Sequence, residues 1–184
     1  MVSTTAKLVI ILGSPASGKS TLARRLGTDL NLGVLGKDDV KEALFDALGS
    51  EDRGFSRRLS EASFTVLARL ARTQLLLGHS CIVEGNWRSS HAPSLGAILD
   101  ESGARAAQVC CCAQPSEIVR RFTTRVRHAG HRDASLSSDE LEAYAREAPA
   151  FIDVPGPRWV FHTDSDESAE AYCELRTALE SWRL

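Results

Sequence analysis

The sequence lacks the long apolar run that a membrane-spanning helix needs. Its longest apolar run near the start, Leu8 to Leu12, is strand-sized, whereas a spanning helix takes about 20 residues. The first residues, Met1 to Ala6, also lack the charged and apolar leader of secreted proteins. We therefore expect a protein that makes no membrane contact and works in the cytoplasm.

The cysteines lack the spacing of a zinc site or a disulfide framework. There are five, no CxxC pattern occurs, and Cys110, Cys111 and Cys112 are adjacent. Because neighbouring strand residues point to opposite faces, such a run cannot easily form paired bridges or a zinc cage. We expect reduced, mostly buried thiols that act as small hydrophobes, as in cytoplasmic proteins.

The chain also lacks a strong charge of either sign. Its net charge of −2 argues against a general nucleic-acid binder. With 43% hydrophobic and 25% charged residues it has the balance of a globular protein, and 184 residues suit one ordinary domain. We find no internal repeat and no linker, so residues 1–184 are predicted to form a single domain.

Strand-like and helix-like segments alternate along the chain. Short apolar, β-branched runs predict strands at residues 7–12, 34–35, 80–84, 104–113 and 158–162. Helical spacing, such as that of Leu22, Leu26 and Leu30, predicts helices at about 18–30, 38–48, 57–77, 95–100, 116–126, 139–147 and 172–182. This alternation predicts an α/β fold, a three-layer αβα sandwich around a five-stranded, mainly parallel sheet.

The segment GSPASGKS, from Gly13 to Ser20, is an unbroken GxxxxGK[ST] motif between a predicted strand and a predicted helix. Its glycines let backbone N–H groups turn toward phosphate oxygens, and the helix beginning at Gly18 presents its positive end to the same anion. Lys19 supplies charge to the β- and γ-phosphates, and the Ser20 hydroxyl can hold Mg²⁺. The sequence therefore predicts a P-loop NTPase that binds ATP and Mg²⁺ through Gly13, Ser14, Ala16, Ser17, Gly18, Lys19, Ser20 and Thr21.

Motifs of other P-loop classes are missing. No NKxD guanine motif is present, and the DxxG match at Asp46 to Gly49 lies at the end of an amphipathic helix, where coincidence explains it. The strand that ends at Glu84 is followed by Gly85 and Asn86, which fits a motor ATPase poorly. These absences favour a kinase.

A kinase needs a group that accepts the proton of the acceptor hydroxyl. Asp38 and Asp39 directly follow the second predicted strand, at the carboxyl edge of the sheet where ligands bind. Asp38 is our predicted general base. The alternative is that Asp38 is the N-cap of the next helix and Asp39 favours its dipole.

A kinase also needs cations over the transferred phosphoryl group. Residues Arg120 to Arg132 hold five arginines and two histidines, and Arg121 and Arg125 lie four apart, on one side of the predicted helix. A solvated helix face is one explanation. The other is an Arg-rich lid at about residues 120–137 that closes over ATP and excludes water, with His128 and His131 touching phosphate.

Four segments together resemble the P-loop kinases of the zeta-toxin type, which include chloramphenicol phosphotransferase and the kinase domain of phage polynucleotide kinase. They are Gly13 to Thr21, Leu35 to Gly49, Ile82 to Trp87, and the Arg-rich segment that ends at Asp133. The resemblance implies that Asp38 activates the acceptor hydroxyl, with Lys19 and Arg125 as the other catalytic residues. It implies lid contacts to the nucleotide by Arg121, Arg125 and Arg127, and a place near adenine for the Thr163 to Ser165 loop.

The resemblance also implies an acceptor site. Its predicted residues are Lys37, Asp38, Lys41, Glu84, Asn86, Trp87 and Arg88. Glu84 stands where relatives have Asp, so a substrate role and a Mg²⁺ role both stay open. Trp87 fits stacking on a substrate ring and a place in the core equally well.

The predicted acceptor is a small hydroxylated molecule such as an antibiotic, a sugar or a nucleoside. A nucleic-acid 5′-OH end is the second choice, because the only concentrated basic segment is already assigned to ATP. A nucleotide-dependent regulatory ATPase without an acceptor is the alternative from another class.

Overall fold

The computed structural model describes residues 5–49, 52–126, 128–131, 139, 143, 146, 151–165 and 168–183. Its sheet has the strand order β2-β3-β1-β4-β5, and every neighbouring pair is parallel. The strands are β1 (Lys7–Gly13), β2 (Gly33–Gly36), β3 (Cys81–Glu84), β4 (Arg105–Cys112) and β5 (Arg158–His162). The predicted five-stranded parallel sheet is confirmed.

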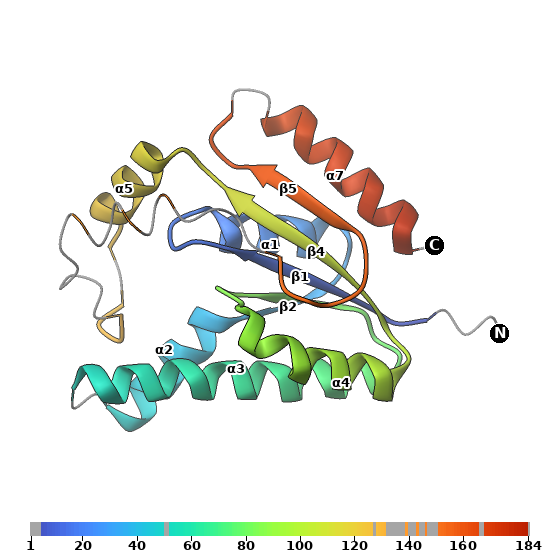
Figure 1. Ribbon diagram of the computed structural model, residues 1–184, viewed down its shortest axis with the longest axis horizontal. Helices are drawn as coiled ribbons and strands as arrows, with labels where there is room; N and C mark the ends of the chain where they lie inside the picture. Colours follow the sequence, from blue (N-terminus) through green and yellow to red (C-terminus); the bar gives the residue numbers. More distant parts are fainter. Residues whose placement is uncertain are drawn as a thin grey trace.

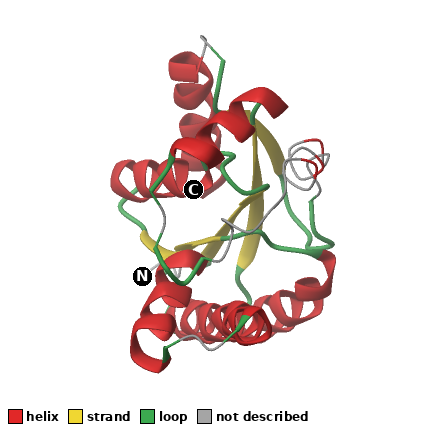
Figure 2. Ribbon diagram, turned by 90° about the vertical axis from the view of Figure 1, so that its left-hand side faces the viewer, coloured by secondary structure: helices red, strands yellow, loops and turns green. Residues whose placement is uncertain are grey.

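Helices cover both faces of this sheet (Figures 1 and 2). α1 and α7 lie on one face, and α3 and α4 on the other, with α2 beside α3. The helices are α1 (Lys19–Asp29), α2 (Lys37–Leu48), α3 (Arg53–Leu76), α4 (Ala92–Ser102), α5 (Pro115–Thr124) and α7 (Ser168–Arg183), with a 3₁₀ helix η1 (Ser89–His91). The three-layer αβα sandwich is therefore present as predicted.

The central strand β1 is buried on both faces, which explains its continuous apolar run. Leu8, Ile10 and Leu12 pack toward α3 and α4, while Val9 and Ile11 pack toward α1 and α7. The same alternation divides the neighbouring cysteines of β4 between the two core clusters. All five cysteines are free; three are buried, one is half-buried, and Cys173 is exposed.

Several helix boundaries differ from the prediction. α2 begins at Lys37 with Gly36 as its N-cap, so Asp38 lies inside the first turn and the N-cap interpretation of Asp38 is wrong. α3 begins one turn earlier than predicted because the Asp52 carboxylate caps it, accepting a hydrogen bond from the Phe55 N–H at 2.6 Å. α4 is longer than predicted at both ends. The helix predicted at 139–147 lies mostly outside the described residues.

Among the described helices, none combines the length and the apolar character that a bilayer crossing requires.

The turn before β5 depends on a glycine. Gly156 has φ +134°, and a Cβ atom there would overlap the carbonyl oxygen of Ala106. We expect Gly156→Ala to lower the free energy of unfolding by about 3 kcal/mol, because the backbone would have to leave this conformation. Urea denaturation measures the change.

The control for this substitution is Gly96→Ala in α4, where a Cβ atom meets nothing within 4 Å. This change should stabilise the protein by up to about 1 kcal/mol, since alanine favours a helix. Equal denaturation midpoints for the two variants would show that the turn does not need its glycine.

Candidate active site

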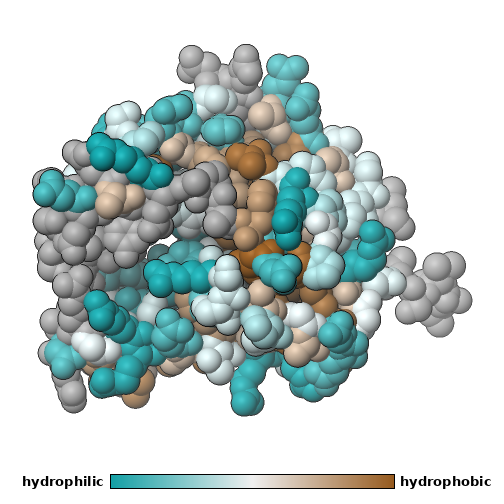
Figure 3. Space-filling model, in the orientation of Figure 1, coloured by the Kyte–Doolittle hydropathy of each residue, from teal (hydrophilic) through white to brown (hydrophobic). Residues whose placement is uncertain are grey.

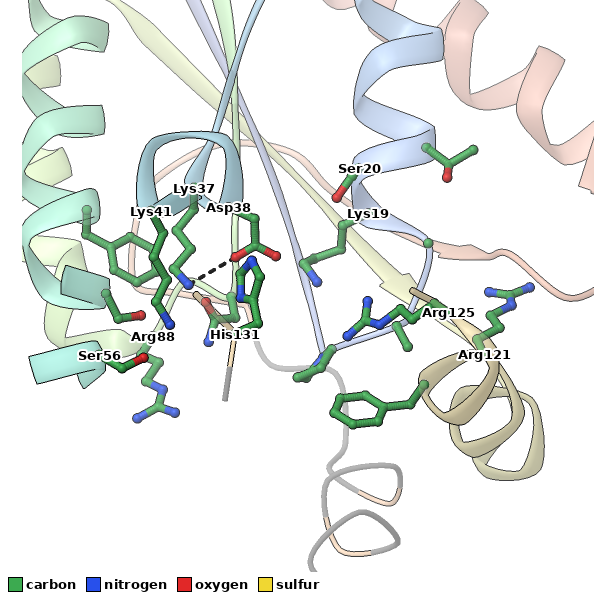
Figure 4. Close-up of a pocket in the computed structure, with 18 of the residues that line it drawn as sticks. Lys19, Ser20, Lys37, Asp38, Lys41, Ser56, Arg88, Arg121, Arg125 and His131 are labelled. Atoms are coloured by element: carbon green, nitrogen blue, oxygen red, sulfur yellow. Dashed lines mark hydrogen bonds and ion pairs between the residues drawn. The ribbon is translucent and has the colours of Figure 1, made fainter. Parts of the chain in front are cut away.

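A cleft of about 1020 Å³ opens at the carboxyl ends of β1, β2 and β3. Its walls come from the loop between β1 and α1, the start of α2, the first turns of α3, the turn after β3, and α5. Because parallel strands end at one edge of the sheet, segments far apart in the sequence meet there. Figure 4 shows the side chains at this edge, and Figure 3 shows hydrophilic residues around the hollow beside them.

The loop of residues 13–20 has the backbone of a phosphate-binding loop. Gly13, Ala16 and Gly18 all have positive φ values, of 144°, 62° and 85°. Such alternation turns successive N–H groups toward one concave point, where an anion binds. A Cβ atom at Gly13 would overlap the carbonyl oxygen of Cys111, so the glycine of the motif is required by packing as well.

Some of the predicted nucleotide-binding residues of this loop line the cleft, and the others lie behind them. Those that line the cleft are Ala16, Gly18, Lys19, Ser20 and Thr21. Gly13, Ser14 and Ser17 form the body of the loop, and the Ser14 carbonyl accepts a hydrogen bond from Lys19 Nζ at 2.9 Å. The Lys19 ammonium therefore lies over the loop where a phosphate would sit.

Glu84 faces the phosphate loop. Ser20 Oγ donates a hydrogen bond to Glu84 Oε2 at 3.2 Å, and Glu84 is only 5% exposed. Burial raises the pKa of the Glu84 carboxyl, while Lys19 and the Ser20 hydrogen bond lower it in part. Of the two roles left open for Glu84, this position favours metal contact over substrate contact.

The donor set fits Mg²⁺. A hydroxyl and a carboxylate are hard oxygen donors, and Mg²⁺ takes few protein ligands beside phosphate oxygens and water. Within the described residues, no group of three or more His, Cys, Asp and Glu side chains could hold a metal on its own. Ser20 and Glu84 are therefore the residues that could hold Mg²⁺ together with a bound nucleotide.

The two neighbouring aspartates point to different places. Asp38 lines the cleft and forms an ion pair with Lys37, with 3.0 Å between Nζ and Oδ1 (Figure 4). Asp39 instead pairs with Arg24 of α1 at 3.2 Å, and both of these side chains are exposed. Only Asp38 is therefore placed to act on a molecule in the cleft.

Arg121 joins α5 to the phosphate loop. Its guanidinium donates to the Thr163 hydroxyl at 2.7 Å and to the Thr163 carbonyl at 3.0 Å. The Thr163 hydroxyl in turn donates to the Ser17 carbonyl at 3.0 Å. Arg121 also binds Glu117, and Arg120 and Arg121 together lower the pKa of this carboxyl to about 2. Thr163 thus lies against the phosphate loop, and Arg121 is held by protein groups.

Arg125 is placed differently. Its Nε and Nη2 atoms are buried, and no described residue offers either a hydrogen-bond partner. The guanidinium lies 4.9 Å from the centre of the Phe122 ring. Burial lowers the pKa of this guanidinium, whereas the charge of Asp38 raises it. Since unsatisfied buried donors are costly, and Arg125 also lines the cleft, its contact with an anionic ligand stays our prediction. Arg127, the third predicted arginine, lies outside the described residues.

Residues 128–131 are attached to α2 and α3. His128 Nε2 lies 3.0 Å from Asp46 Oδ1, and His131 Nε2 lies 2.8 Å from Glu42 Oε1. Ser56 Oγ donates to the Gly130 carbonyl at 3.3 Å. The histidines thus contact carboxylates of α2, and His131 also lines the cleft. Their contact with phosphate stays a prediction.

Trp87 is a core residue. It is 6% exposed and packs edge-on against Phe64 at 4.9 Å and against His91 at 5.6 Å. It does not line the cleft, unlike its neighbours Asn86 and Arg88, because consecutive residues after β3 point to different sides. Of the two interpretations of Trp87, the core is correct and the substrate contact is wrong.

The contribution of α3 to the cleft was not predicted from the sequence. The added cleft residues are Ser56, Arg57, Ser60, Glu61 and Phe64 of α3, together with His91 after β3. The signal was present, since Ser56 and Ser60, and Arg57 and Glu61, are four apart and so share one helix face. Only Ser56 lies before the expected start of the helix at Arg57. The other α3 residues were inside the predicted helix, and which of its faces meets the cleft depends on tertiary contacts.

Comparison with known proteins gives the family. The family described as AAA domain matches residues 8–149 of the chain. The structure of a candidate kinase from Chloroflexus aurantiacus is similar, with a TM-score of 0.85 and 31% identity, covering 94% of this chain and 98% of that one.

Two curated relatives differ in how much of their length is matched. An adenylate kinase of Thermus thermophilus is 28% identical, covering 93% of this chain and 96% of that protein. An uncharacterised protein of Mycobacterium tuberculosis is 30% identical over 166 residues, covering 84% of this chain. The chain spans about a third of the length of that mycobacterial protein, since 33% of it is covered.

The family match does not confirm the zeta-toxin type, which stays a prediction. The match nonetheless includes the phosphate loop and Asp38, and the structural similarity extends over almost the whole chain. The chain therefore belongs to the AAA domain family and has the α/β fold of the P-loop kinases.

Proposed function

We propose that this protein is an ATP-dependent kinase that transfers the γ-phosphate of ATP to a hydroxyl group of a small molecule. The observation that carries the proposal is the place of Asp38. Its carboxylate lines the same cleft as the phosphate-loop Lys19 and as Arg125, whose Nε and Nη2 find no hydrogen-bond partner among the described residues. A carboxylate in this position supports the proposal because transfer to a hydroxyl needs a group that accepts its proton.

The residues take distinct parts in the transfer. The Asp38 carboxylate accepts the proton of the acceptor hydroxyl, whose oxygen forms a bond to the γ-phosphorus. The bond from that phosphorus to the bridging oxygen of ADP breaks, and ADP leaves with its electron pair. Lys37 holds Asp38 in place, and Lys19 and Arg125 stabilise the charge on the transferred group.

The Arg-rich segment that begins with α5 completes the site as a lid in this proposal. Arg121 anchors it beside the phosphate loop, and the contacts of His128 and His131 hold its far side on α2. α5 therefore lies beside the phosphate loop, and residues 128–131 lie beside α2, where Asp38 is. We propose that it excludes water, which would otherwise hydrolyse ATP.

Mg²⁺ is the metal proposed for this site, and it neutralises phosphate charge when bound. We expect Glu84→Gln to weaken Mg²⁺ affinity in the presence of ATP by about tenfold, since the Ser20 hydroxyl loses its charged acceptor. Titration of activity with MgCl₂ measures this.

The raised pKa of Glu84 adds a pH dependence to this prediction. The ionised form is the one that supports the metal, so wild-type affinity should fall as the pH drops through the raised pKa of Glu84, beyond the fall that protonation of ATP itself causes. The Glu84→Gln variant should show only the fall that is due to ATP, because its amide has no proton to bind. An unchanged Mg²⁺ affinity in the variant would remove Glu84 from the metal site.

The test of the proposed function is ATP consumption in the presence of hydroxyl compounds. Sugars, nucleosides, hydroxylated antibiotics and 5′-OH oligonucleotides are supplied with Mg²⁺ and ATP. Mass spectrometry then detects the gain of one phosphoryl group. A small molecule that raises ATP consumption and gains a phosphoryl group supports the proposed kinase. Transfer to the oligonucleotides alone supports the 5′-OH alternative. ATP hydrolysis that no acceptor raises would support a regulatory ATPase.

A second candidate comes from the similarity to an adenylate kinase, which acts on a phosphate instead of a hydroxyl. AMP therefore belongs in the acceptor panel. An ionised phosphate needs no base, so Asp38→Asn should leave transfer to AMP almost intact. The same substitution should strongly reduce transfer to a hydroxyl, which separates the two candidates.

A further inference from the structure

One wall of the cleft combines a histidine and a carboxylate that the proposed transfer does not use. They are His91, which ends the 3₁₀ helix after β3, and Glu61 of α3. α3 packs beside α2, which carries Asp38, whereas α5 with its arginines follows β4, on the opposite side of the central strand β1 (Figure 1). His91 and Glu61 therefore lie on the side of the cleft where the proposed acceptor binds.

The His91 ring is held in one orientation. Its Nδ1 atom accepts a hydrogen bond from the Arg88 backbone N–H at 3.0 Å. The ring lies against Phe64, with 4.1 Å between the ring centroids, and meets Trp87 edge-on at 5.6 Å. Only 14% of the His91 side chain is exposed. These contacts fix the direction of the other ring nitrogen, Nε2.

The same contacts decide which nitrogen of His91 carries the proton. Because Nδ1 accepts a hydrogen bond, the neutral imidazole carries its proton on Nε2. Burial lowers the pKa of His91, while the charge of Glu61 opposes this shift and that of Arg88 supports it. At neutral pH the ring is therefore uncharged and offers one N–H donor, at Nε2, beside Glu61.

Glu61 faces this donor without a direct hydrogen bond. Its Oε2 atom lies 3.9 Å from His91 Nε2, and 76% of the Glu61 side chain is exposed. An N–H···O hydrogen bond is about 2.7–3.2 Å long, so the two atoms are too far apart to satisfy each other. An oxygen atom about 2.8 Å from both would bridge the gap. Such an atom has to accept from the nitrogen and donate to the carboxylate.

This double requirement selects a hydroxyl group. A hydroxyl has one hydrogen to donate and two lone pairs to accept. An ammonium group has no lone pair for the Nε2 proton, and an ionised carboxylate has no hydrogen for Glu61. A substrate hydroxyl in this place makes the same bonds as a bridging water, which it replaces.

We infer that the acceptor is a polyol, one hydroxyl of which receives the phosphoryl group beside Asp38 while a second hydroxyl bridges His91 Nε2 and Glu61 Oε2. The inference rests on the proposed function for the role of the first hydroxyl. The bridge holds the acceptor against α3 from two different elements of the fold. Sugars, cyclitols and nucleosides carry such sets of hydroxyls, whereas simple alcohols do not.

The first experiment measures binding apart from turnover. The protein is saturated with Mg²⁺ and AMPPNP and titrated by calorimetry with glucose, myo-inositol, ribose and adenosine, and with analogues that lack one hydroxyl each. At least one polyol should bind, and one of its deoxy analogues should bind at least about tenfold more weakly. Glu61→Met and His91→Phe should bind this polyol as weakly as that analogue, because each variant lacks one side of the bridge.

The matched control is Glu174→Met, which changes an exposed carboxylate of α7 on the other face of the sheet. It should bind every compound as the wild type does. Glu61 is exposed, so Glu61→Met tests the bridge independently of any stability that His91→Phe loses. If no polyol binds, or if Glu61→Met still prefers the polyol to its deoxy analogue, the inference is wrong.

The second experiment measures transfer. Glu61→Met should raise KM for the polyol by about tenfold with little change in kcat, since the bridge binds the acceptor away from the reacting group. Transfer to cyclohexanol, which has one hydroxyl, as efficient as transfer to myo-inositol would contradict the inference while leaving the kinase in place. Selective polyol binding without transfer to any acceptor would contradict the proposed kinase and keep the hydroxyl site.

Discussion

Replacement of Asp38 by Asn is expected to lower kcat for transfer to a hydroxyl by about a thousandfold, within the range that general bases contribute. Asn keeps the shape of the side chain and can still accept the hydrogen bond from Lys37 Nζ. It cannot take the proton of the acceptor. Steady-state kinetics with an acceptor from the screen measures the loss, and nucleotide titration should show unchanged ATP affinity.

The neighbouring residue provides a matched control. Asp39→Asn removes the same charge one position later, but Asp39 pairs with Arg24 on the exposed side of α2. Exposed pairs contribute only about 0–1 kcal/mol, so this variant should keep both its stability and its kcat. Equal losses of kcat in the two variants would mean that the activity depends on negative charge at the start of α2, and that Asp38 has no role as a base.

The pH profile adds an independent measure. An active base must be ionised, so wild-type kcat should fall on the acidic side of the profile. At saturating Mg²⁺, where protonation of Glu84 does not limit the rate, the acidic limb should disappear in Asp38→Asn, because the residual reaction no longer depends on that proton. An acidic limb that survives in the variant would assign it to another group.

The fold was largely predictable because its signals are local. The buried strands appear as uninterrupted apolar runs, and the phosphate loop is defined by glycines that packing and positive φ both require. The cap at Asp52 was missed, and with it the first turn of α3. That turn supplies Ser56 to the cleft, so the overlooked cap hid one of the residues that line it.

The site was predictable only in part, because it depends on the direction in which each side chain points. Asp38 and Asp39 are adjacent and chemically equal, and only the pairing of Asp39 with Arg24 separates them. Trp87 lies between two cleft residues, yet it turns into the core. Arg121 and Arg125 share the predicted spacing, but Thr163 and Glu117 engage only Arg121. Such differences depend on tertiary contacts that sequence spacing does not contain.

Arg125→Met is expected to lower kcat by about a thousandfold, the lower end of what an arginine over the transferred phosphoryl group contributes in phosphoryl transfer. Methionine removes the charge and the donors but keeps an unbranched chain that can pack on Phe122. Because Nε and Nη2 have no partner among the described residues, the substitution removes two unsatisfied donors. The free energy of unfolding without nucleotide should therefore stay the same or rise.

Arg121→Met provides the contrast. It breaks hydrogen bonds to Thr163 and the ion pair with Glu117, so it should lower the free energy of unfolding by about 1–2 kcal/mol. Denaturation and kinetics on both variants separate a positioning arginine from one that acts on the phosphoryl group. If Arg125→Met lost stability while keeping kcat, Arg125 would be a structural residue, and the cation for the transferred group would have to come from elsewhere in the cleft.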